Sequence, residues 1–339
     1  MGEETCPATT QPEVRQLVDQ TKRYDVLIAG QGAAAFSAAL YAARYQMSAI
    51  IVGGIFGGET ATGGIIENYP GYPEIDGFDL MLKFREQVDK YEVPVIEENI
   101  NSIERSDDEF TVTTEGGQTF KATTAILAIG RERRRLWLDH EEEWTGRGVS
   151  FCSTCDAPMH RGNTVAVVGG GNAAVEGAVL LSKYAEQVYL VYRQDQFTRP
   201  EPINLQLLDA AKNVEQVMGT RVMELKGDDG LSGIVLDNEV RGSKELELDG
   251  LFIEIGADPR SELASKLGAE LNDQGEVLVD KEMRTQVHGL FAAGDLTNAS
   301  GDLKQTITAA AQGAIAATAA YYEVSTHPNA CQWHAKVEA

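Results

Sequence analysis

The sequence predicts an α/β fold made of two Rossmann-like dinucleotide-binding domains of the three-layer ββα type, one inserted into the other. Two glycine-rich turns with the pattern G-x-G-x-x-A, at residues 30–35 and 169–174, each stand between an apolar strand-like run and a helix-like run. A third observation is the late segment 289–295, an apolar run that ends in Gly-Asp and precedes another helix. Two copies of one plan are far less frequent by chance than a single glycine-rich turn, so the repeat is a strong signal.

The first turn has the residues that a bound dinucleotide requires. Residues 24–29 form an apolar strand-like run, and Gly30 then permits a tight turn. Gly32 lets a pyrophosphate approach the backbone, and Ala35 lets the next helix lie close to the strand. That helix is expected to reach about residue 45, and its free N–H groups and positive dipole end face the phosphates.

The second strand of this unit, residues 49–52, is not followed by the acid that usually holds a ribose hydroxyl. Glu59, just beyond a Gly-Gly pair, is the nearest candidate, and a solvated loop acid is the alternative interpretation.

A hairpin and a linker are expected next. Residues 110–114 and 119–122 alternate around a Glu-Gly-Gly turn and predict a hairpin. Residues 125–130 predict a buried strand that ends in glycine, and the charged run 131–135 predicts an exposed linker between the domains.

The same order repeats in the second unit. Residues 164–168 form a strand-like run, a helix is expected to about residue 183, and the next strand is expected at residues 187–191. The unit is completed by an expected meander and a closing strand, at residues 222–226, 232–236, 245–248 and 252–256. The predicted divisions are an N-terminal tail 1–23, a discontinuous first domain 24–130 and 253–324, an inserted second domain 131–252, and a C-terminal tail 325–339.

Cys152 and Cys155 are separated by two residues and stand at the front edge of the second unit. Such a pair forms a small disulfide ring when oxidised and passes two electrons to another disulfide when reduced. Asp156 follows directly, where it can supply or take a proton. A structural zinc site is one alternative, although Cys6 and Cys331 each stand alone near a terminus, and a buried inert pair is another. The position between two expected dinucleotides favours redox chemistry, because a flavin exchanges electrons with both a nicotinamide and a dithiol.

The late segment returns the chain to the first domain. Residues 304–306 open a helix expected over residues 307–322, whose first N–H groups would favour the anionic reduced form of a flavin ring. Asp295 is a candidate partner for a ribityl hydroxyl, and a helix or loop cap is its alternative interpretation.

The composition limits which binding partners and which cellular location are expected. With 29 basic against 52 acidic residues the net charge is −23, so nucleic acids and anionic membranes are not expected as partners. Adaptation to high salt is one explanation of this charge, and an ordinary soluble acidic surface is the other. The first residues lack the basic start and apolar run of a signal peptide, and no uncharged run is apolar enough to cross a membrane. A cytoplasmic protein is therefore expected.

Over residues 24–323 the sequence resembles the low-molecular-weight thioredoxin reductases. The matching motifs occur in the family's order, and they are Gly30-Gln31-Gly32, Gly57-Gly58, Glu67-Asn68-Tyr69-Pro70-Gly71, residues 148–156, residues 169–174 and residues 291–295. Among related flavoproteins, placement of the cysteine pair in the second domain is specific to this group. Residues 89–95 are most similar to archaeal members.

The resemblance implies a homodimer with one FAD in each subunit and a rotation of the two domains against each other. It implies that Cys155 faces the flavin, that Cys152 attacks the partner disulfide, and that Asp156 donates and accepts the proton. The implied FAD-binding residues are Gly30, Gly32, Ala33, Ala34, Gly58, Glu59, Asn68, Asp295, Lys304, Gln305 and Thr306. The implied nicotinamide-nucleotide residues are Gly169, Gly171, Asn172, Ala173, Arg193 and Arg199.

Three departures from the family pattern bear on function. The first turn reads G-Q-G-A-A-A instead of G-x-G-P-A-G, and Glu59 replaces a glutamine, which is expected to raise the cost of reducing a flavin to its anion. Residues 192–199 read Y-R-Q-D-Q-F-T-R where NADPH-using members read H-R-R-D-x-F-R-A, so Arg193 stays in place and Arg199 is shifted by one. A 2′-phosphate requires an arginine clamp, and the loss of two such contacts costs about 1.5–3 kcal/mol each. NADPH, NADH, reduced ferredoxin and reduced flavin therefore all stay open as donors.

These features predict an enzyme that reduces a disulfide of thioredoxin or a thioredoxin-like protein, with electrons passing from the donor through FAD to the cysteine pair. A non-catalytic flavoprotein that senses redox state is the alternative from another class, and the Cys-x-x-Cys-Asp set argues against it. The segment 326–339, with Cys331 and Trp333, is predicted either to be a disordered tail or to cover a flavin face or relay thiols.

Overall fold

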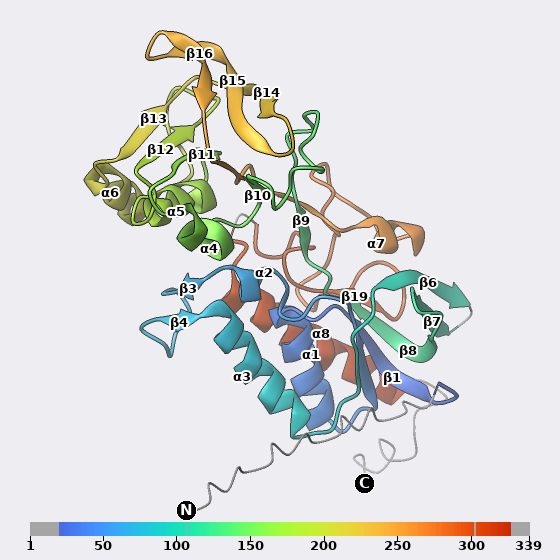
Figure 1. Cartoon of the computed structure of the whole chain (residues 1–339). Helices are drawn as coiled ribbons and strands as arrows, with labels where there is room; N and C mark the ends of the chain where they lie inside the picture. The colour runs from blue at the N-terminus through green and yellow to red at the C-terminus, as the bar shows by residue number, and fades with distance from the viewer. Residues whose placement is uncertain (1–19, 107, 302, 327–339) are drawn as a thin grey trace, which may run out of the picture.

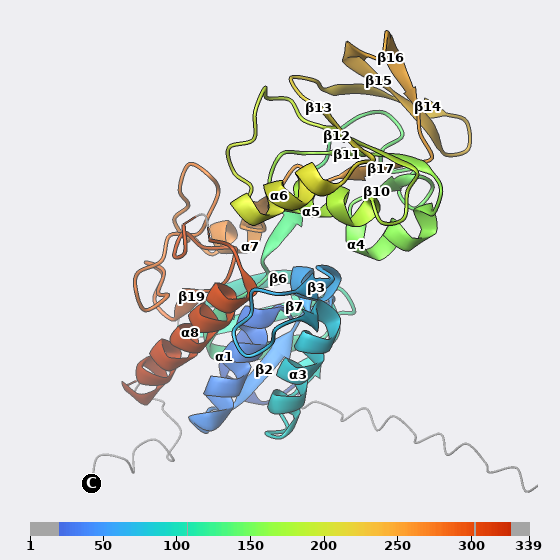
Figure 2. The same cartoon turned by 90° about the vertical axis from the view of Figure 1, so that its left-hand side faces the viewer.

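The computed structural model describes residues 20–106, 108–301 and 303–326, and it has two lobes (Figure 1, Figure 2). The first lobe lies at the bottom of Figure 1 and contains both ends of the described chain, and the second lobe lies above it. The predictions for Cys6, for most of the N-terminal tail and for residues 327–339, including Cys331 and Trp333, lie outside the described residues.

The first lobe is built on a seven-stranded sheet. Its parallel strands, in spatial order, are β5 (Val95–Ile96), β2 (Ala49–Val52), β1 (Arg23–Ala29), β8 (Thr119–Leu127) and β19 (Leu290–Ala292). Two antiparallel strands, β7 (Glu109–Thr114) and β6 (Ile100–Ser106), extend the sheet from the first half of β8. All four residues of β2 are buried, as expected of a parallel strand with both faces covered.

Three helices of the first lobe pack against this sheet, and they are α1 (Ala33–Arg44), α3 (Gly77–Asp89) and α8 (Thr306–Thr326) (Figure 2). Helix α8 lies so close to α1 that a Cβ at Gly313 would be 2.0 Å from the carbonyl oxygen of Ala34. Between β2 and α3 the chain forms the short helix α2 (Gly58–Thr62) and the strand pair β3 (Ile65–Ile66) and β4 (Ile75–Asp76).

The second lobe repeats the plan on a five-stranded parallel sheet. Its strands, in spatial order, are β10 (Val149–Ser150), β17 (Gly250–Ile253), β11 (Thr164–Val168), β12 (Gln187–Val191) and β13 (Val214–Val217). The helical segments are α4 (Ser153–Asp156), the short 3-10 helix η1 (Ala157–His160), α5 (Asn172–Leu181) and α6 (Pro202–Ala210). A separate antiparallel sheet contains β14 (Val222–Gly227), β15 (Leu231–Val240) and β16 (Ser243–Glu247).

The chain crosses between the lobes through β9 (Arg131–Arg133) and β18 (Ala257–Pro259), which pair antiparallel, and α7 (Glu262–Lys266) follows. The run 131–135 links the two lobes, as the sequence predicted, but it is only partly exposed. Glu132 and Arg134 are exposed, whereas the side chains of Arg131 and Arg133 are 21% and 26% exposed and ion-paired. The boundary expected before residue 253 also moves, because Ile253 pairs with Val168 in the second sheet.

Two further differences from the sequence expectations have local causes. Residues 119–127 form one continuous strand instead of two, because the first part of β8 pairs with β7 and the last part pairs with β19. Helix α3 was not predicted, although Asp76 caps it by accepting hydrogen bonds from Phe78 N at 2.9 Å and Asp79 N at 3.4 Å. Among the helices of the described ranges, none is both long and apolar enough to cross a membrane.

We expect Gly313→Ala to lower the melting temperature of the protein. In an open helix position this change would stabilise by about 1 kcal/mol through helix propensity. At Gly313 the new methyl group meets backbone that cannot move aside, so the clash with Ala34 turns the expected stabilisation into a destabilisation. Thermal unfolding followed by circular dichroism measures the effect, with Ala311→Gly at an exposed position of α8 as the control for propensity alone. An unchanged or higher melting temperature for Gly313→Ala would contradict the packing.

Candidate active site

Cys152 and Cys155 form a disulfide at the carboxyl end of β10, with the two sulfur atoms 2.07 Å apart. Cys152 occupies the N-cap position of α4 in an extended conformation. The backbone N–H of Cys155 donates to Cys152 Sγ at 3.1 Å, and the hydroxyl of Ser150 accepts from Cys152 N at 3.0 Å. An N–H group directed at this sulfur stabilises the negative charge that a thiolate carries after reduction.

The disulfide rests on the first lobe, at the end of α2. Cys152 Sγ lies 3.4 Å from the carbonyl oxygen of Thr62, and the hydroxyl of Thr154 donates to the carbonyl oxygen of Gly63 at 3.4 Å. The approach is so close that a Cβ at Gly64 would be 2.1 Å from Thr154. The pair is thus held where the two lobes meet, and within the described ranges no three His, Cys, Asp or Glu side chains form a metal-binding group.

Asp156, the residue after Cys155, ends α4. Its backbone N–H donates to the carbonyl oxygen of Cys152 at 3.3 Å. Its carboxylate makes no hydrogen bond or ion pair to the described residues, so it is available for proton exchange. Burial lowers the pKa of the neighbouring His160, and the negative charges of Asp156 and Asp249 oppose this shift.

The first glycine-rich turn has the backbone geometry of a dinucleotide site. Gly30 has φ of +117°, and a Cβ there would be 2.3 Å from the carbonyl oxygen of Ala128, so only glycine fits. Gly32 faces open space, with no atom within 4 Å of its Cβ position, and the Cβ position of Gly58 is 3.5 Å from Gly32. Ala33 and Ala34 are buried beneath this opening. A pyrophosphate can therefore approach the backbone at the start of α1.

Two further segments that hold predicted flavin residues meet beside this opening. Asn68 Nδ2 donates to Gln305 Oε1 at 3.1 Å, and the hydroxyls of Thr60 and Thr306 are 3.1 Å apart. These contacts hold the start of α8 against the segment that begins with α2. Since the disulfide rests on the other end of α2, the redox pair and the flavin residues share one short element.

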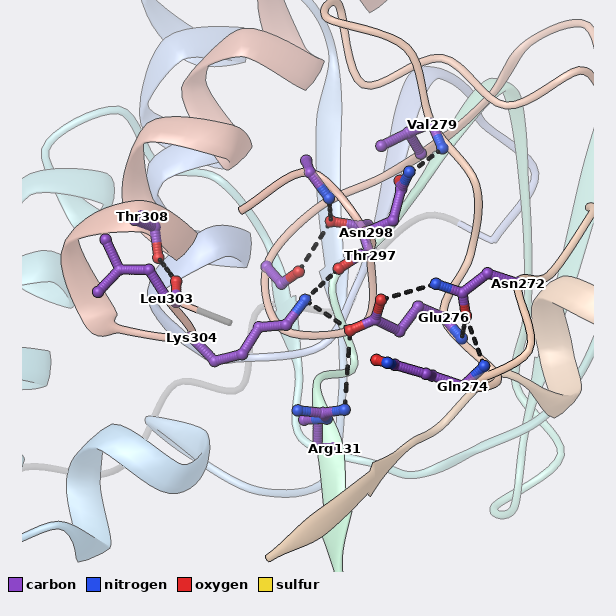
Figure 3. A network of polar contacts seen from close by, with 12 residues as sticks. Arg131, Asn272, Gln274, Glu276, Val279, Thr297, Asn298, Leu303, Lys304 and Thr308 are labelled. Atoms are coloured by element: carbon purple, nitrogen blue, oxygen red, sulfur yellow. Dashed lines mark hydrogen bonds and ion pairs between the residues drawn. The ribbon is translucent and has the colours of Figure 1, made fainter. Parts of the chain in front are cut away.

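Lys304 belongs to a buried polar network that the sequence did not reveal (Figure 3). Its ammonium group lies 2.8 Å from Glu276 Oε1, and the guanidinium of Arg131 is 3.8 Å from the same oxygen. Asn272 Nδ2 donates to Glu276 Oε2 at 2.9 Å. Burial alone would raise the pKa of Glu276, but the hydrogen bonds from Lys304 and Asn272 and the charges of Lys304 and Arg131 hold it below its ordinary value. Sequence reasoning missed Glu276, because no local pattern announces a pairing between distant residues.

The carboxylate of Asp295 and one side-chain oxygen of Gln31 make no hydrogen bond to the described residues. Burial raises the pKa of Asp295, and the charges of Lys304 and Arg131 work against that shift. Gln31 is 3% exposed and donates from Nε2 to the carbonyl oxygen of Gly53, while its Oε1 is buried without a hydrogen bond. Buried polar groups of this kind require a partner, and the hydroxyls of FAD can supply one. Together with the open glycine turn, these residues fit FAD.

Glu59 lies in α2 and not in a loop, its side chain is 53% exposed as a solvated acid would be, and its Oε2 accepts from Arg133 Nε at 2.9 Å. The positive charge of Arg133 offsets the negative charge of Glu59. The cost that Glu59 was expected to add to flavin reduction is therefore reduced by a partner from β9, which the sequence did not identify.

The second glycine-rich turn has the same backbone but a different lining. A Cβ at Gly169 would be 2.2 Å from the carbonyl oxygen of Glu254, whereas Gly171 faces open space. The ring of Tyr192 lies directly on Gly170, 2.1 Å from its Cβ position. Asn172, at the start of α5, accepts from Glu201 N at 2.7 Å and donates to the Glu201 carboxylate at 3.4 Å.

The remaining predicted nicotinamide residues are exposed. Ala173, Arg193 and Arg199 lie on the surface, and the two arginines make no ion pair with the described residues. The turn thus fits a dinucleotide, and two cations are free to meet a phosphate. The carboxylate of Glu201 at the start of α5 opposes this, because it stands where a helix end attracts an anion. Sequence reasoning missed Glu201, which lies beyond the family motif.

These features define a class of proteins: oxidoreductases with two dinucleotide folds and a redox-active disulfide. Residues 24–313 match the pyridine nucleotide-disulphide oxidoreductase family. The chain is 38% identical over 297 residues to the thioredoxin reductase of Mycolicibacterium smegmatis, covering 86% of this chain and 94% of that protein.

Two solved structures are also similar. The Lactococcus lactis thioredoxin reductase in its FR conformation is 35% identical, with a TM-score of 0.83 over 89% of this chain and 99% of the other. The Streptococcus pyogenes thioredoxin reductase is 36% identical, with a TM-score of 0.60 over 90% of this chain and 99% of the other. The chain belongs to the pyridine nucleotide-disulphide oxidoreductases and, within them, to the thioredoxin reductase family of FAD-containing disulfide oxidoreductases.

We expect Lys304→Met to destabilise the protein by about 3 kcal/mol near neutral pH, the cost of leaving a buried carboxylate without its main cation. Because the pKa of Glu276 is lowered in the folded protein, its stabilising effect is present above the unfolded pKa and is lost as the pH falls through the lowered value. The difference from wild type should therefore shrink in acid. Urea unfolding between pH 3 and pH 7 measures it. Lys226→Met, which breaks an exposed pair with Glu224, is the control, and equal losses in both variants would contradict the analysis.

Proposed function

We propose that this protein passes two electrons through FAD to the Cys152–Cys155 disulfide and on to thioredoxin or a thioredoxin-like protein. The observation that carries the proposal is the place of the disulfide. Cys152 Sγ is 3.4 Å from Thr62, at the end of the short helix that begins with Gly58 and Glu59. Electrons held by a flavin at that helix are therefore close to the disulfide. The names of the related thioredoxin reductases support the identity of the partner.

The chemistry follows from the two cysteines and Asp156. Bound FAD supplies a carrier that takes two electrons from a donor and passes them to a disulfide. Reduction of the Cys152–Cys155 bond takes two electrons and two protons and leaves two thiols. The thiolate of Cys152 attacks the partner disulfide, forming a mixed disulfide and releasing one partner thiolate. Cys155 then attacks the Cys152 sulfur of that mixed disulfide, which re-forms the ring and releases the second partner thiolate. Asp156 is the proposed proton donor and acceptor.

The roles of the two sulfurs rest on the family resemblance. In the arrangement described here, Cys152 Sγ lies on the first lobe, and Cys155 is the more exposed residue. The assignment of Cys155 to the flavin and Cys152 to the partner therefore needs a direct test.

We expect Cys155→Ser to keep FAD bound and reducible, yet to lose the reduction of protein disulfides completely. With Cys152 as the attacking thiol, this variant should trap a thioredoxin-like protein as a mixed disulfide, seen as a heavier band without reducing agent. Cys152→Ser is the matched variant and should trap nothing. If only Cys152→Ser trapped the thioredoxin-like protein, the roles of the two cysteines would be the reverse of those proposed. Turnover by Cys155→Ser would refute the scheme.

The proposed donor is a nicotinamide dinucleotide, NADPH or NADH, bound along the second glycine-rich turn. The open face of Gly171 supports this site, as do Arg193 and Arg199, which make no ion pair with the described part of the chain. A second candidate replaces the nicotinamide with reduced ferredoxin or reduced flavin. The Glu201 carboxylate at the turn favours this candidate, because it repels the pyrophosphate of any dinucleotide.

Anaerobic titration of the flavoprotein with NADPH and, separately, NADH distinguishes the donors. Stoichiometric bleaching of flavin absorbance by one of them identifies it, whereas bleaching by dithionite alone supports ferredoxin or reduced flavin. If a dinucleotide binds, Glu201→Gln should tighten it about two- to fivefold, since a charge at a helix N-terminus is worth about 0.3–1 kcal/mol. Glu186→Gln, another acid of this lobe, is the control. An unchanged dinucleotide affinity in Glu201→Gln would show that the Glu201 carboxylate does not repel the dinucleotide.

A cytoplasmic homodimer is part of the same proposal. Apolar side chains on β3 and α3 are exposed in one subunit, with Ile65 at 63%, Phe78 at 48% and Leu82 at 39%. Such a patch supports burial against a second copy. A non-catalytic flavoprotein that senses redox state is the alternative function. It would be supported only if no protein disulfide were reduced with any donor.

A further inference from the structure

We propose that Arg133 and Glu254 are positioning residues of the disulfide reaction: together with Glu59 they anchor Ser153, between the two cysteines, and hold the redox turn against the first lobe. The inference deepens the proposed function and rests on the redox role of the Cys152–Cys155 pair. It does not depend on the identity of the donor or of the partner.

The anchor begins inside the redox turn. Ser153 stands between the two cysteines and is 4% exposed. Both its backbone N–H and its hydroxyl donate to Glu254 Oε1, at 3.3 Å and 3.0 Å. Glu254 directly follows β17, so it fixes the turn to the second strand of the second sheet. One carboxylate oxygen thereby orders the backbone that carries both sulfurs.

Arg133 connects this anchor with the first lobe. Its Nη1 lies 3.9 Å from Glu254 Oε1, and its Nε donates to Glu59 Oε2 at 2.9 Å. Glu254 belongs to the second lobe, Glu59 to α2 of the first, and Arg133 to the crossing strand β9. The guanidinium of Arg133 thus lies between Glu254 of the second lobe and Glu59 of the first lobe. Glu59 belongs to α2, the short helix on which the disulfide rests.

Because the Glu254 carboxylate is buried, the positive charge of Arg133 beside it is important. The side chain of Glu254 is 11% exposed and that of Arg133 is 26% exposed, and Arg133 Nη1 is buried without a hydrogen-bond acceptor among the described residues. Burial raises the pKa of Glu254, and the charge of Arg133 and the hydrogen bonds from Ser153 oppose that shift. Without Arg133, the pKa of Glu254 would rise further, which favours its neutral form. A neutral carboxyl accepts more weakly than a carboxylate, so the hold on Ser153 would loosen.

The contacts that bring the disulfide to the first lobe are weak without this linkage. They are the approach of Cys152 Sγ to Thr62 and a long hydrogen bond from Thr154 to Gly63, both at 3.4 Å.

Hydrogen–deuterium exchange of the purified, flavin-bound protein tests the anchor. We expect Arg133→Gln to speed exchange of the Ser153 amide about tenfold, and Glu254→Gln to do the same. The double variant should exchange no faster than the faster single variant, because the two residues act through one hydrogen bond. Arg133→Lys retains the charge and should restore most of the protection, which covers the case in which Arg133→Gln folds poorly.

The equilibrium of the disulfide with dithiothreitol gives a second readout that does not require turnover. A loosened turn holds its two thiols at a lower effective concentration, so Arg133→Gln should shift this equilibrium toward the dithiol by about threefold. Arg134→Gln is the matched control, because Arg134 is on the same crossing segment and forms an exposed pair with Asp258. If Arg133→Gln matches Arg134→Gln in both exchange and equilibrium, the proposal is wrong, even if the protein reduces thioredoxin.

Discussion

The double crossing of the chain between its lobes is the constraint on which the rest of the structure depends. Strands β9 and β18 pair at this point, so charged side chains of β9 are partly buried and must find partners. Arg131 turns to Glu276 in the first lobe, and Arg133 reaches Glu59 and faces Glu254. The crossing therefore does more than join two domains: its two cations neutralise acids beside the flavin residues and beside the redox turn.

The two glycine-rich turns show how one backbone plan serves different purposes. Both need glycine where a Cβ would meet a carbonyl oxygen, and both leave the next glycine of the motif open to a ligand. At the first turn, the buried Oε1 of Gln31 has no hydrogen bond to the described residues, which favours a bound FAD. The second has the carboxylate of Glu201 at the start of its helix, which disfavours an anionic ligand. Similar folds thus differ in what they attract because of single charges outside the motif.

Much of the fold followed from local pattern. The strands at residues 49–52, 164–168 and 187–191 were predicted with the bounds that the structure gives, because runs of buried apolar residues between turns are local signals. Residues 119–127 were divided wrongly, since a strand that changes partners along its length has no local signature. Helix α3 was overlooked although its cap at Asp76 was visible, and the partial burial of Arg131 and Arg133 was missed because charge usually signals exposure.

The sequence by itself determined the class of fold, the two dinucleotide turns, the cysteine pair and the family resemblance. Each of these depends on residues close together in the chain, where glycine, cysteine and apolar periodicity act directly on the backbone. Only the tertiary structure decided which charges meet: Glu276 with Lys304, Glu59 with Arg133, and Glu254 with Ser153. These pairings join residues far apart in sequence, and a charge carries no local mark of its partner until packing brings the two together and removes water from between them.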